Sequence, residues 1–481
     1  MESISRGKYY KYPMVVSQVL FPLIALSLFF LPLNGLPERK LLGELSLEGA
    51  VYPMFIAVII YGLAVIKRGR INKPNHLSYK LLMLFLAWVL ISGILNSHGI
   101  LTNFTKGRSG VEKFSLQFIL LLFVFFTSIV SYATLRPFHR KNILLIFRRW
   151  ILFSFLFAGI YSLVIEIPAQ LGQGWAISIL GYITPIIYHF DYLNLDRLRS
   201  LSGEASWFGM YLVFVFPWLM SYYFTERKTY KYIYLALIVY ALVLTFLTYS
   251  RTAYFIISFQ ILAFVMIIFY KGIHRYRRQL LRLLIITVPL LGVLIIETNA
   301  GNKIVYISRS LFEQDTEFQQ SNIARSGSQL TGIKMGLNHP LAGVGLGQYG
   351  FNMPDYLPAW AWESEEINIW ASSSSDTEWA PVHGLWARIL AETGFVGLFL
   401  WLSVWISVLI LVWKRYRKLR QIEKQNSILA LSLLISILGL MLNGLIADSL
   451  RILSYWITLG VAWAWLTKPS TDSLAANRKE P

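Results

Sequence analysis

The sequence predicts an all-α protein, a polytopic transmembrane helical bundle of about twelve spans with one large, partly helical loop on the non-cytoplasmic face. Of its 481 residues, 56% are hydrophobic and only 14% are charged, and the mean hydropathy is +0.54. A soluble protein could not cover so much apolar surface with so few charges. Apolar runs of membrane-spanning length recur along the chain, and basic residues fill every second connection between them.

The predicted spans follow the apolar runs in order. Each run is near the about 20 residues that cross a bilayer as a helix. The runs lie at 14–34, 48–66, 78–96, 114–133, 146–167, 205–224, 231–249, 252–270, 280–297, 394–413, 428–446 and 450–467. The first run follows a basic N-terminus without a small-residue cleavage site, so we expect a retained span rather than a signal peptide.

Basic residues mark one face of the predicted bundle, because they precede the first span and then follow every second one. They are Arg6, Lys8, Lys11, Lys67, Arg68, Arg70, Lys73, Arg136, Arg140, Lys141, Arg227, Lys228, Lys231, Lys271, Arg275, Arg277, Arg278, Arg282, Lys414, Arg415, Arg417, Lys418 and Arg420. The positive-inside rule therefore predicts that both termini are cytoplasmic. It also explains most of the net charge of +19, which in a soluble protein would favour nucleic-acid binding.

The spans divide the chain into four parts. Residues 1–297 hold spans 1–9, and residues 298–393 form the large loop. Residues 394–467 hold spans 10–12, and residues 468–481 form a polar tail that is predicted to be disordered and cytoplasmic. A loop as long as 298–393 is usually functional or disordered. The chain has no cysteine, which excludes disulfides, thiolate metal sites and a cysteine nucleophile.

Arginines at the outer boundary of the predicted bundle are the first candidates for a binding site. Arg251 stands at the junction of two spans, and Arg197 and Arg199 precede Glu204 where a connection re-enters the membrane. Arginine at a membrane boundary is costly unless it reaches water or an anion, and its planar fork suits phosphate oxygens. Arg251 therefore binds either a substrate anion or lipid phosphate, and the arginines near Glu204 form either an anion site or a structural Arg–Glu pair.

The large loop carries two further motifs. Arg325 and His339 precede a glycine-rich turn at 343–347, whose backbone N–H groups could form an anion-binding nest. The turn is not a nucleotide fingerprint, because no strand–turn–helix unit surrounds it. His383 begins an amphipathic stretch and has the natural pKa of a general base, although a lone histidine is more often structural. No cluster of His, Asp and Glu has metal-ligand spacing, and no Ser-His-Asp signature is present.

Together these features resemble the O-antigen polymerase/ligase family, the Wzy-type polymerases and WaaL-type ligases of bacterial surface polysaccharides. The predicted spans and the single large outer loop between late spans also match that family. The most specific parts of the resemblance are Ser250-Arg251-Thr252-Ala253, His339-Pro340 with Gly343-Val344-Gly345-Leu346-Gly347, and His383 with Glu392-Thr393-Gly394-Phe395-Val396-Gly397.

The resemblance implies a multi-pass glycosyltransferase of the C-type superfamily in the bacterial inner membrane, with a periplasmic active site. Such enzymes move a glycan from undecaprenyl pyrophosphate to an acceptor hydroxyl without a metal, ATP or a nucleotide sugar. By the same resemblance, Arg251 and Arg199 would bind the pyrophosphate, with Arg325 as a further candidate. His383 would deprotonate the acceptor. The supporting residues would be Glu204, Glu392 and His339.

The resemblance also implies the partners. They are an undecaprenyl-pyrophosphate-linked oligosaccharide, an acceptor glycan (a lipid-linked repeat unit or lipid A-core), the lipid bilayer, a chain-length regulator and a flippase, with no nucleic acid. Loop tryptophans could stack on sugar rings or lie on the membrane; they are Trp360, Trp362, Trp370 and Trp379.

Polymerase and ligase are both open for this sequence. The segment Gly203-Glu204-Ala205-Ser206 resembles the Glu-x-Ser segment of polysaccharide polymerases, which favours a polymerase over an O-antigen ligase. A membrane transporter or flippase is the alternative from another class. Carriers place polar residues near the bilayer midplane, however, whereas the candidates here lie at the outer face. A structural scaffold for an export complex is the remaining alternative.

Overall fold

The computed structural model describes residues 17–39, 44–188, 195–271, 274–297, 317–374 and 379–467. The predicted tail at 468–481, the start of the large loop at 298–316 and the basic residues before the first span lie outside these ranges. Helices dominate the described ranges, and the one sheet in them is a short antiparallel hairpin of β1 (Phe104–Thr105) and β2 (Arg108–Ser109). The all-α prediction is confirmed.

Within the described ranges, eight helical segments are long and apolar enough to cross a membrane. One of them, Asn142–Gln170, joins α6 (Arg140–Tyr161), the π-helix η2 (Ser162–Glu166) and α7 (Ile167–Gln170). The other seven are α2 (Val51–Arg68), α3 (Leu77–Leu95), α5 (Gly110–Leu135), α9 (Ala205–Thr225), α11 (Arg251–Lys271), α17 (Leu385–Ile422) and α18 (Lys424–Asn443). This pattern is that of a multi-pass membrane protein.

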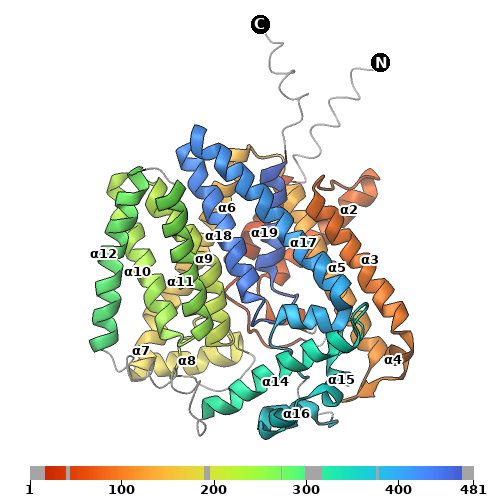
Figure 1. Ribbon diagram of the computed structural model, residues 1–481. Coiled ribbons are helices and arrows are strands. Elements are labelled where there is room, and N and C mark those ends of the chain that lie inside the picture. Colours follow the sequence, from red (N-terminus) through yellow and green to blue (C-terminus); the bar gives the residue numbers. More distant parts are fainter. Residues whose placement is uncertain are drawn as a thin grey trace, which may run out of the picture.

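Shorter apolar helices accompany these eight. They are the helix Ser17–Phe29, α8 (Gly174–Ile187), α10 (Lys231–Leu247) and α19 (Leu453–Leu466). A further helix, α12 (His274–Glu297), begins with basic residues and stands at the edge of the bundle (Figure 1). Each predicted apolar run coincides with a helix in the described ranges, whereas α8 lies in a connection where no span was predicted.

The helix ends fall into two groups at opposite ends of the bundle. At one end, Arg140 at the start of α6 donates through Nε to the carbonyl of Thr467 beyond α19, at 2.7 Å. At the same end, Tyr276 near the start of α12 bonds the carbonyl of Lys424 at the start of α18. The connections that were predicted to be basic therefore share one end of the molecule.

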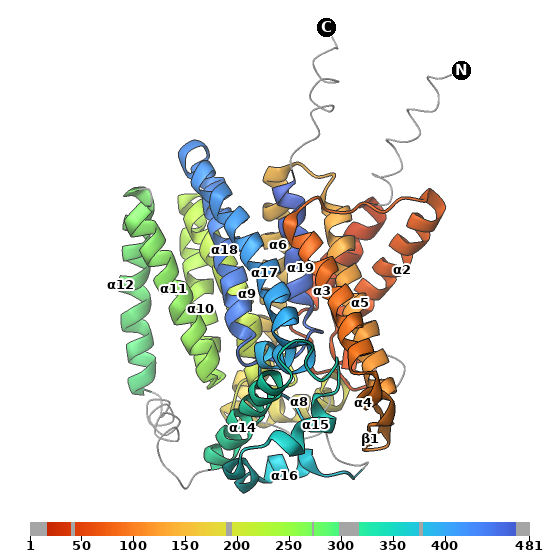
Figure 2. The same cartoon turned by 45° about the vertical axis from the view of Figure 1, so that its right-hand side comes forward.

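The large loop forms a cap at the other end of the bundle (Figure 2). Its regular elements are α14 (Glu317–Asn338), α15 (Tyr349–Tyr356), the 3-10 helix η4 (Ala359–Glu363) and α16 (Glu365–Ala371). They share a small core of their own, which includes Met335, Tyr349, Met353 and Ile367. The short α4 (Ser97–Thr102) and the β1–β2 hairpin lie at this same end.

A break in α17 joins the cap to the bundle. Gly394 has φ 68° and ψ −171° inside this helix, so the part before it is a separate helical piece. The glycine-rich turn of the loop docks on the break: the N–H of Val344 bonds the carbonyl of Ala391 at 2.9 Å, and the N–H of Gly345 bonds that of Glu392 at 3.0 Å. A Cβ on Gly394 would collide with the carbonyl of Leu341. The N–H groups of Val344 and Gly345 are therefore not available to an external anion, and the N–H of Gly347 bonds the carboxyl group of Glu392.

The centre of the bundle includes α9, α5 and α18, whose apolar stretches are 89%, 78% and 72% buried. Large indoles fill it, and polar side chains satisfy two of them. Trp218 Nε1 donates to Ser436 Oγ at 3.3 Å, and Trp463 Nε1 donates to Ser78 Oγ at 2.7 Å. Such hydrogen bonds and close packing hold helices together in a bilayer, where lipid removes the hydrophobic drive between them.

Candidate active site

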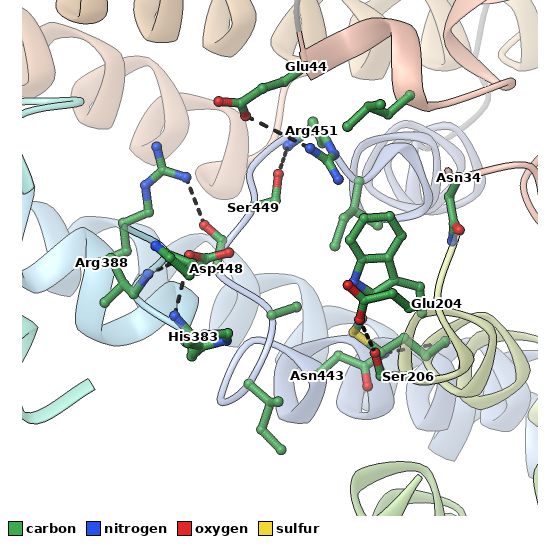
Figure 3. Close-up of a pocket in the computed structure, with 18 of the residues that line it drawn as sticks. Asn34, Glu44, Glu204, Ser206, His383, Arg388, Asn443, Asp448, Ser449 and Arg451 are labelled. Carbon is green, nitrogen blue, oxygen red and sulfur yellow. Dashed lines mark hydrogen bonds and ion pairs between the residues drawn. The ribbon is translucent and has the colours of Figure 1, made fainter. Parts of the chain in front are cut away.

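A cavity of about 1700 Å³ opens at the capped end of the bundle. Its walls come from segments far apart in the sequence: the connection before α2, the segment before α9, the start of α11, α14 of the cap, the start of α17 and the link between α18 and α19. The cavity is thus built where the large loop meets the helix ends. Figure 3 shows part of its lining.

His383 lies on the cavity wall just before α17. Its backbone adopts φ 56°, which is rare for a residue other than glycine. The carboxylate of Asp448 holds this conformation by accepting the N–H of Val382 at 2.6 Å and the N–H of His383 at 3.3 Å (Figure 3). The side-chain amide of Gln329 donates to the carbonyl of His383. The loop that carries the imidazole is therefore fixed from two sides.

The imidazole of His383 is buried and carries a nitrogen without a partner among the described residues. Its ring centroid lies 5.3 Å from that of Trp370, and no donor or acceptor in the described part of the chain bonds its buried Nε2. Burial lowers the pKa of His383 to about 4; the carboxylate of Asp448 opposes this shift, and the guanidinium of Arg325 adds to it. The ring is neutral at pH 7, with one nitrogen available as an acceptor.

Three of the arginines that line the same cavity form what we call the arginine cluster: Arg197, Arg251 and Arg325. Arg251 donates through Nη2 to Asn322 Oδ1 at 2.6 Å, whereas its buried Nη1 bonds nothing in the described ranges. Arg197 Nε donates to the carbonyl of Thr248 at 3.0 Å. Burial lowers the pKa of Arg197, and the positive charge of Arg325 lowers it further. The cluster thus concentrates positive charge in a partly dehydrated place, as an anion site requires.

Arg199 does not line the cavity, in contrast to its predicted role. It is only 2% exposed, and its guanidinium lies 3.7 Å from the ring centroid of Tyr188. The carboxylate of Glu166 accepts the backbone N–H groups of Arg199 at 2.7 Å and Ser200 at 2.6 Å. This contact fixes the loop so that Arg197, rather than Arg199, lines the cavity. The π-helix η2, which ends at Glu166, brings that carboxylate to the loop.

Of the three predicted supporting residues, two line the cavity and one does not. His339 is exposed at the end of α14, where Nε2 contacts the hydroxyl of Tyr356 at 2.9 Å, and it is not part of the cavity lining. Glu204 lines the cavity and accepts the hydroxyl of Ser206 at 2.9 Å. Glu392 also lines it and receives Arg388 Nε at 3.3 Å.

The tryptophans predicted to stack on sugars separate into two pairs. Trp370 and Trp379 line the cavity, and Trp379 lies 3.9 Å from Lys113 Nζ. Trp360 and Trp362 are 41% and 42% exposed and are not part of the lining. A role in stacking on sugars is therefore open to the first pair only.

Several cavity residues were not predicted. Arg388 bonds Gln117 Oε1 and the carbonyl of Asp448, each at 2.9 Å, and so ties α5, α17 and the α18–α19 link together. Arg451, which comes from that link, also lines the cavity. One signal in the sequence could have indicated two of these residues. Lys113 in α5 and Arg388 in α17 precede the apolar runs 114–133 and 394–413 on the same helices, and a charged group at the membrane end of a helix is costly and often has a function.

Metal ligands are not grouped in the described ranges: no three His, Asp or Glu side chains there come close enough to hold an ion. The cavity offers guanidinium groups, which can bind an anion, and a neutral imidazole, which can accept from a hydroxyl. A negatively charged leaving group and a nucleophilic alcohol would both find a partner there.

Comparison with known proteins bears on one part of the chain. A family model described as O-antigen ligase (Wzy_C) matches residues 235–402. No curated protein matches the sequence. The matched segment runs from α10 to the middle of α17 and includes Arg251, Arg325 and His383. The predicted family resemblance is confirmed: residues 235–402 of this membrane protein form a domain of the O-antigen ligase family.

Proposed function

We propose that the protein is a membrane glycosyltransferase that polymerises polysaccharide repeat units carried on undecaprenyl pyrophosphate. One observation carries this proposal. The arginine cluster and the neutral His383 share a single cavity at one end of the bundle. An enzyme that breaks a sugar–pyrophosphate bond needs both groups within reach of one substrate.

The proposed reaction starts with the pyrophosphate of the donor at the arginine cluster. The bond between the anomeric carbon and the phosphate oxygen breaks, and its electron pair stays on the pyrophosphate. Fixed guanidinium groups stabilise that developing charge without reorganising. A hydroxyl of the acceptor attacks the anomeric carbon from the far side, and its proton passes to His383 Nε2. The products are a new glycosidic bond with inverted configuration and free undecaprenyl pyrophosphate.

The proposed topology has twelve spans in the bacterial inner membrane, with both termini cytoplasmic and the cavity periplasmic. The basic connections lie at the end of the bundle away from the cavity, which supports this orientation. A donor lipid that stays in the bilayer would then present its pyrophosphate at the headgroup level, where Arg251 begins α11.

An O-antigen ligase, which transfers the glycan to lipid A-core, is the second candidate. The description of the matched family favours it, whereas the Glu204-Ala205-Ser206 segment on the cavity wall favours the polymerase. A gel of surface polysaccharide from a deletion strain separates them. A single repeat unit on the core indicates a polymerase, and loss of every capped core indicates a ligase. An unchanged ladder would favour transport or another role.

The substitution His383→Ala tests the proposed base. We expect it to lower glycan transfer by about 10²–10⁴-fold, because the attacking hydroxyl loses its proton acceptor. Transfer is measured as polysaccharide ladder formation in a deletion strain that produces the wild-type amount of protein. The matched control is His98→Ala, an exposed histidine on α4 outside the cavity lining. Normal polymer length with His383→Ala would remove this residue from the mechanism.

The substitution Arg251→Lys tests the pyrophosphate contact. A lysine keeps the positive charge but cannot copy the planar fork, so we expect a loss of about 10²-fold or more in transfer. The readout is the same ladder, and the control is Arg149→Lys, which lies on the exposed surface of α6. Near-normal activity of Arg251→Lys would count against a guanidinium clamp.

A further inference from the structure

The cavity has a second polar region, which is chemically unlike the arginine cluster. We call it the α9–α18 wall and define it by Glu204, Ser206, Trp207, Asn443 and Arg451, all of which line the cavity. Figure 3 shows Glu204, Ser206 and Asn443 on one side of the cavity and His383 with Asp448 on the other. Only helix ends and links outside the matched family domain contribute to this wall.

Asn443 carries an unused acceptor at this wall. Its side chain is only 2% exposed, and its Nδ2 donates to the carbonyl of Met210 at 3.3 Å. Within the described ranges, no donor reaches the buried Oδ1 of Asn443. A buried amide oxygen without a partner costs free energy, which a hydroxyl donor from a ligand in the cavity would recover.

The charge of the wall disfavours a second phosphate group. Arg451 is already paired with two acidic side chains of the protein, because its Nε lies 3.2 Å from Glu48 Oε1 and its Nη1 lies 3.9 Å from Glu44 Oε2. Glu204 adds a further carboxylate that accepts only from Ser206 among the hydrogen bonds of the described ranges. The excess of acceptors suits a ligand that is rich in hydroxyl donors and carries no negative charge.

An aromatic surface completes the wall. The guanidinium carbon of Arg451 lies 5.3 Å from the ring centroid of Trp207, which fixes the position of this indole beside Glu204. An apolar ring face next to carboxylate and amide acceptors matches the two surfaces of a pyranose, which has C–H groups on its faces and hydroxyls around its rim.

We propose that the α9–α18 wall is the acceptor subsite and binds an uncharged sugar of the acceptor glycan. Hydroxyls of that sugar donate to Asn443 Oδ1 and Glu204, and its C–H face packs on Trp207. This inference rests on the proposed glycosyltransferase function. It assigns the two substrates to separate regions of one cavity: the pyrophosphate of the donor to the arginine cluster, and the attacking glycan to the α9–α18 wall. The wall residues are positioning residues, which hold the attacking hydroxyl toward His383.

The test uses the full-length protein in lipid nanodiscs and an acceptor without a lipid. Mild acid releases the free repeat-unit oligosaccharide from the lipid-linked pool of the host, and this molecule lacks the pyrophosphate, so it can act only as an acceptor. Transfer of labelled glycan from the lipid-linked donor is measured against the concentration of each substrate. The variants are Asn443→Leu, which removes the acceptor atom at similar size, and Trp207→Leu. Asn338→Leu, at an exposed position outside the lining, is the control.

For Asn443→Leu and Trp207→Leu we expect the KM for the free oligosaccharide to rise by about tenfold or more, with the KM for the donor changed less than twofold. For Arg325→Gln we expect the opposite: the KM for the donor rises, and the KM for the free oligosaccharide changes little. Unchanged acceptor KM values, or equal changes in both KM values, would overturn the subsite. A wild-type protein that binds undecaprenyl pyrophosphate but never uses the free oligosaccharide would overturn it as well.

A different experimental result is expected if the proposed function itself is wrong. A wild-type protein that neither transfers glycan nor binds undecaprenyl pyrophosphate would remove the donor site itself. Because Asn443 is buried, each variant is first checked by size-exclusion chromatography. If Asn443→Leu does not fold, Trp207→Leu and Glu204→Gln decide the outcome.

Discussion

At the scale of single residues, the protonation of His383 is controlled by its burial and by two charged neighbours. The pKa of the imidazole is lowered from 6.5 to about 4, mainly by burial. The charge of Asp448 raises this pKa, and the charge of Arg325 lowers it further. Between pH 6.5 and pH 4 the folded protein keeps this ring neutral, while the unfolded chain protonates it. The folded state therefore binds fewer protons in this window, and the contribution of His383 to stability falls as the pH falls.

This balance predicts the pH profile of transfer. The acid limb of kcat/KM should lie near pH 4 rather than near pH 6.5, because His383 acts only in its neutral form. Arg325→Gln should move that limb upward, since it removes a cation that disfavours the protonated ring. Each profile is normalised to its own maximum, because the variant also binds the donor less well. An acid limb at or above pH 6.5 in the wild type would show that another group is the base.

At the scale of secondary-structure elements, the break in α17 sets the position of the site. The piece of α17 before Gly394 carries Arg388 and Glu392 into the cavity, and the glycine-rich turn at 343–347 is bonded to its end. The turn thus acts as a clamp on α17. It aligns the cap with the bundle, which is the alignment that brings Arg325 and His383 together.

The clamp makes Gly394 a sensitive position. In Gly394→Ala, the new Cβ would meet the carbonyl of Leu341, and the residue would have to keep φ 68°. This combination of positive φ and extended ψ is populated almost only by glycine and costs about 1–3 kcal/mol for a residue with a Cβ, and the collision adds to that cost. We expect a lower midpoint in thermal unfolding of the detergent-solubilised protein, together with reduced transfer.

The matched control for this experiment is Gly62→Ala in α2. A Cβ at Gly62 meets no atom within 4 Å, so this variant should unfold at the temperature of the wild type or slightly above it. If Gly394→Ala were as stable and as active as Gly62→Ala, the break in α17 would have no structural role.

At the scale of the whole molecule, the proposed orientation in the membrane is directly testable because the chain has no cysteine. Lys73 is exposed in the connection after α2, and Asn338 is exposed at the end of α14 near the cavity. A membrane-impermeant maleimide should label Asn338→Cys in intact spheroplasts. It should label Lys73→Cys only after permeabilisation. The opposite pattern would place the cavity in the cytoplasm and rule out the proposed donor.

Much of the architecture could be predicted from the sequence, because apolar run length and loop charge depend only on local composition. Each predicted run coincides with a helix in the described ranges. The number of spans is less direct. α8 is a short apolar helix inside a connection, and α12 begins with basic residues that lower its hydropathy. From the length of the apolar run alone, neither α8 nor α12 can be classified as a membrane span or as a helix on the membrane surface.

The candidate site was predictable where the chemistry is local and not where it depends on folding. Arg251, Arg325 and His383 stand out by residue type, and all three line the cavity. Arg199 lies outside the lining, because Glu166, in a π-helix of another element, bonds its backbone N–H and holds it in a buried loop. Asp448 was missed because it follows His383 by a long stretch of chain and contacts it only after α17 and α18 have folded back.

The link between α18 and α19 supplies both Asp448 and Arg451, and it lies beyond the matched domain, as do α9 and the connection before α2. Under the proposed function, two of the three arginines that hold the leaving group, Arg251 and Arg325, lie inside the matched domain, whereas all residues of the α9–α18 wall lie outside it. A chimera that exchanges residues 235–402 between two relatives should keep the acceptor preference of the recipient. The preference for the acceptor sugar would then change with the segments outside residues 235–402, while Arg251, Arg325 and His383 stay the same.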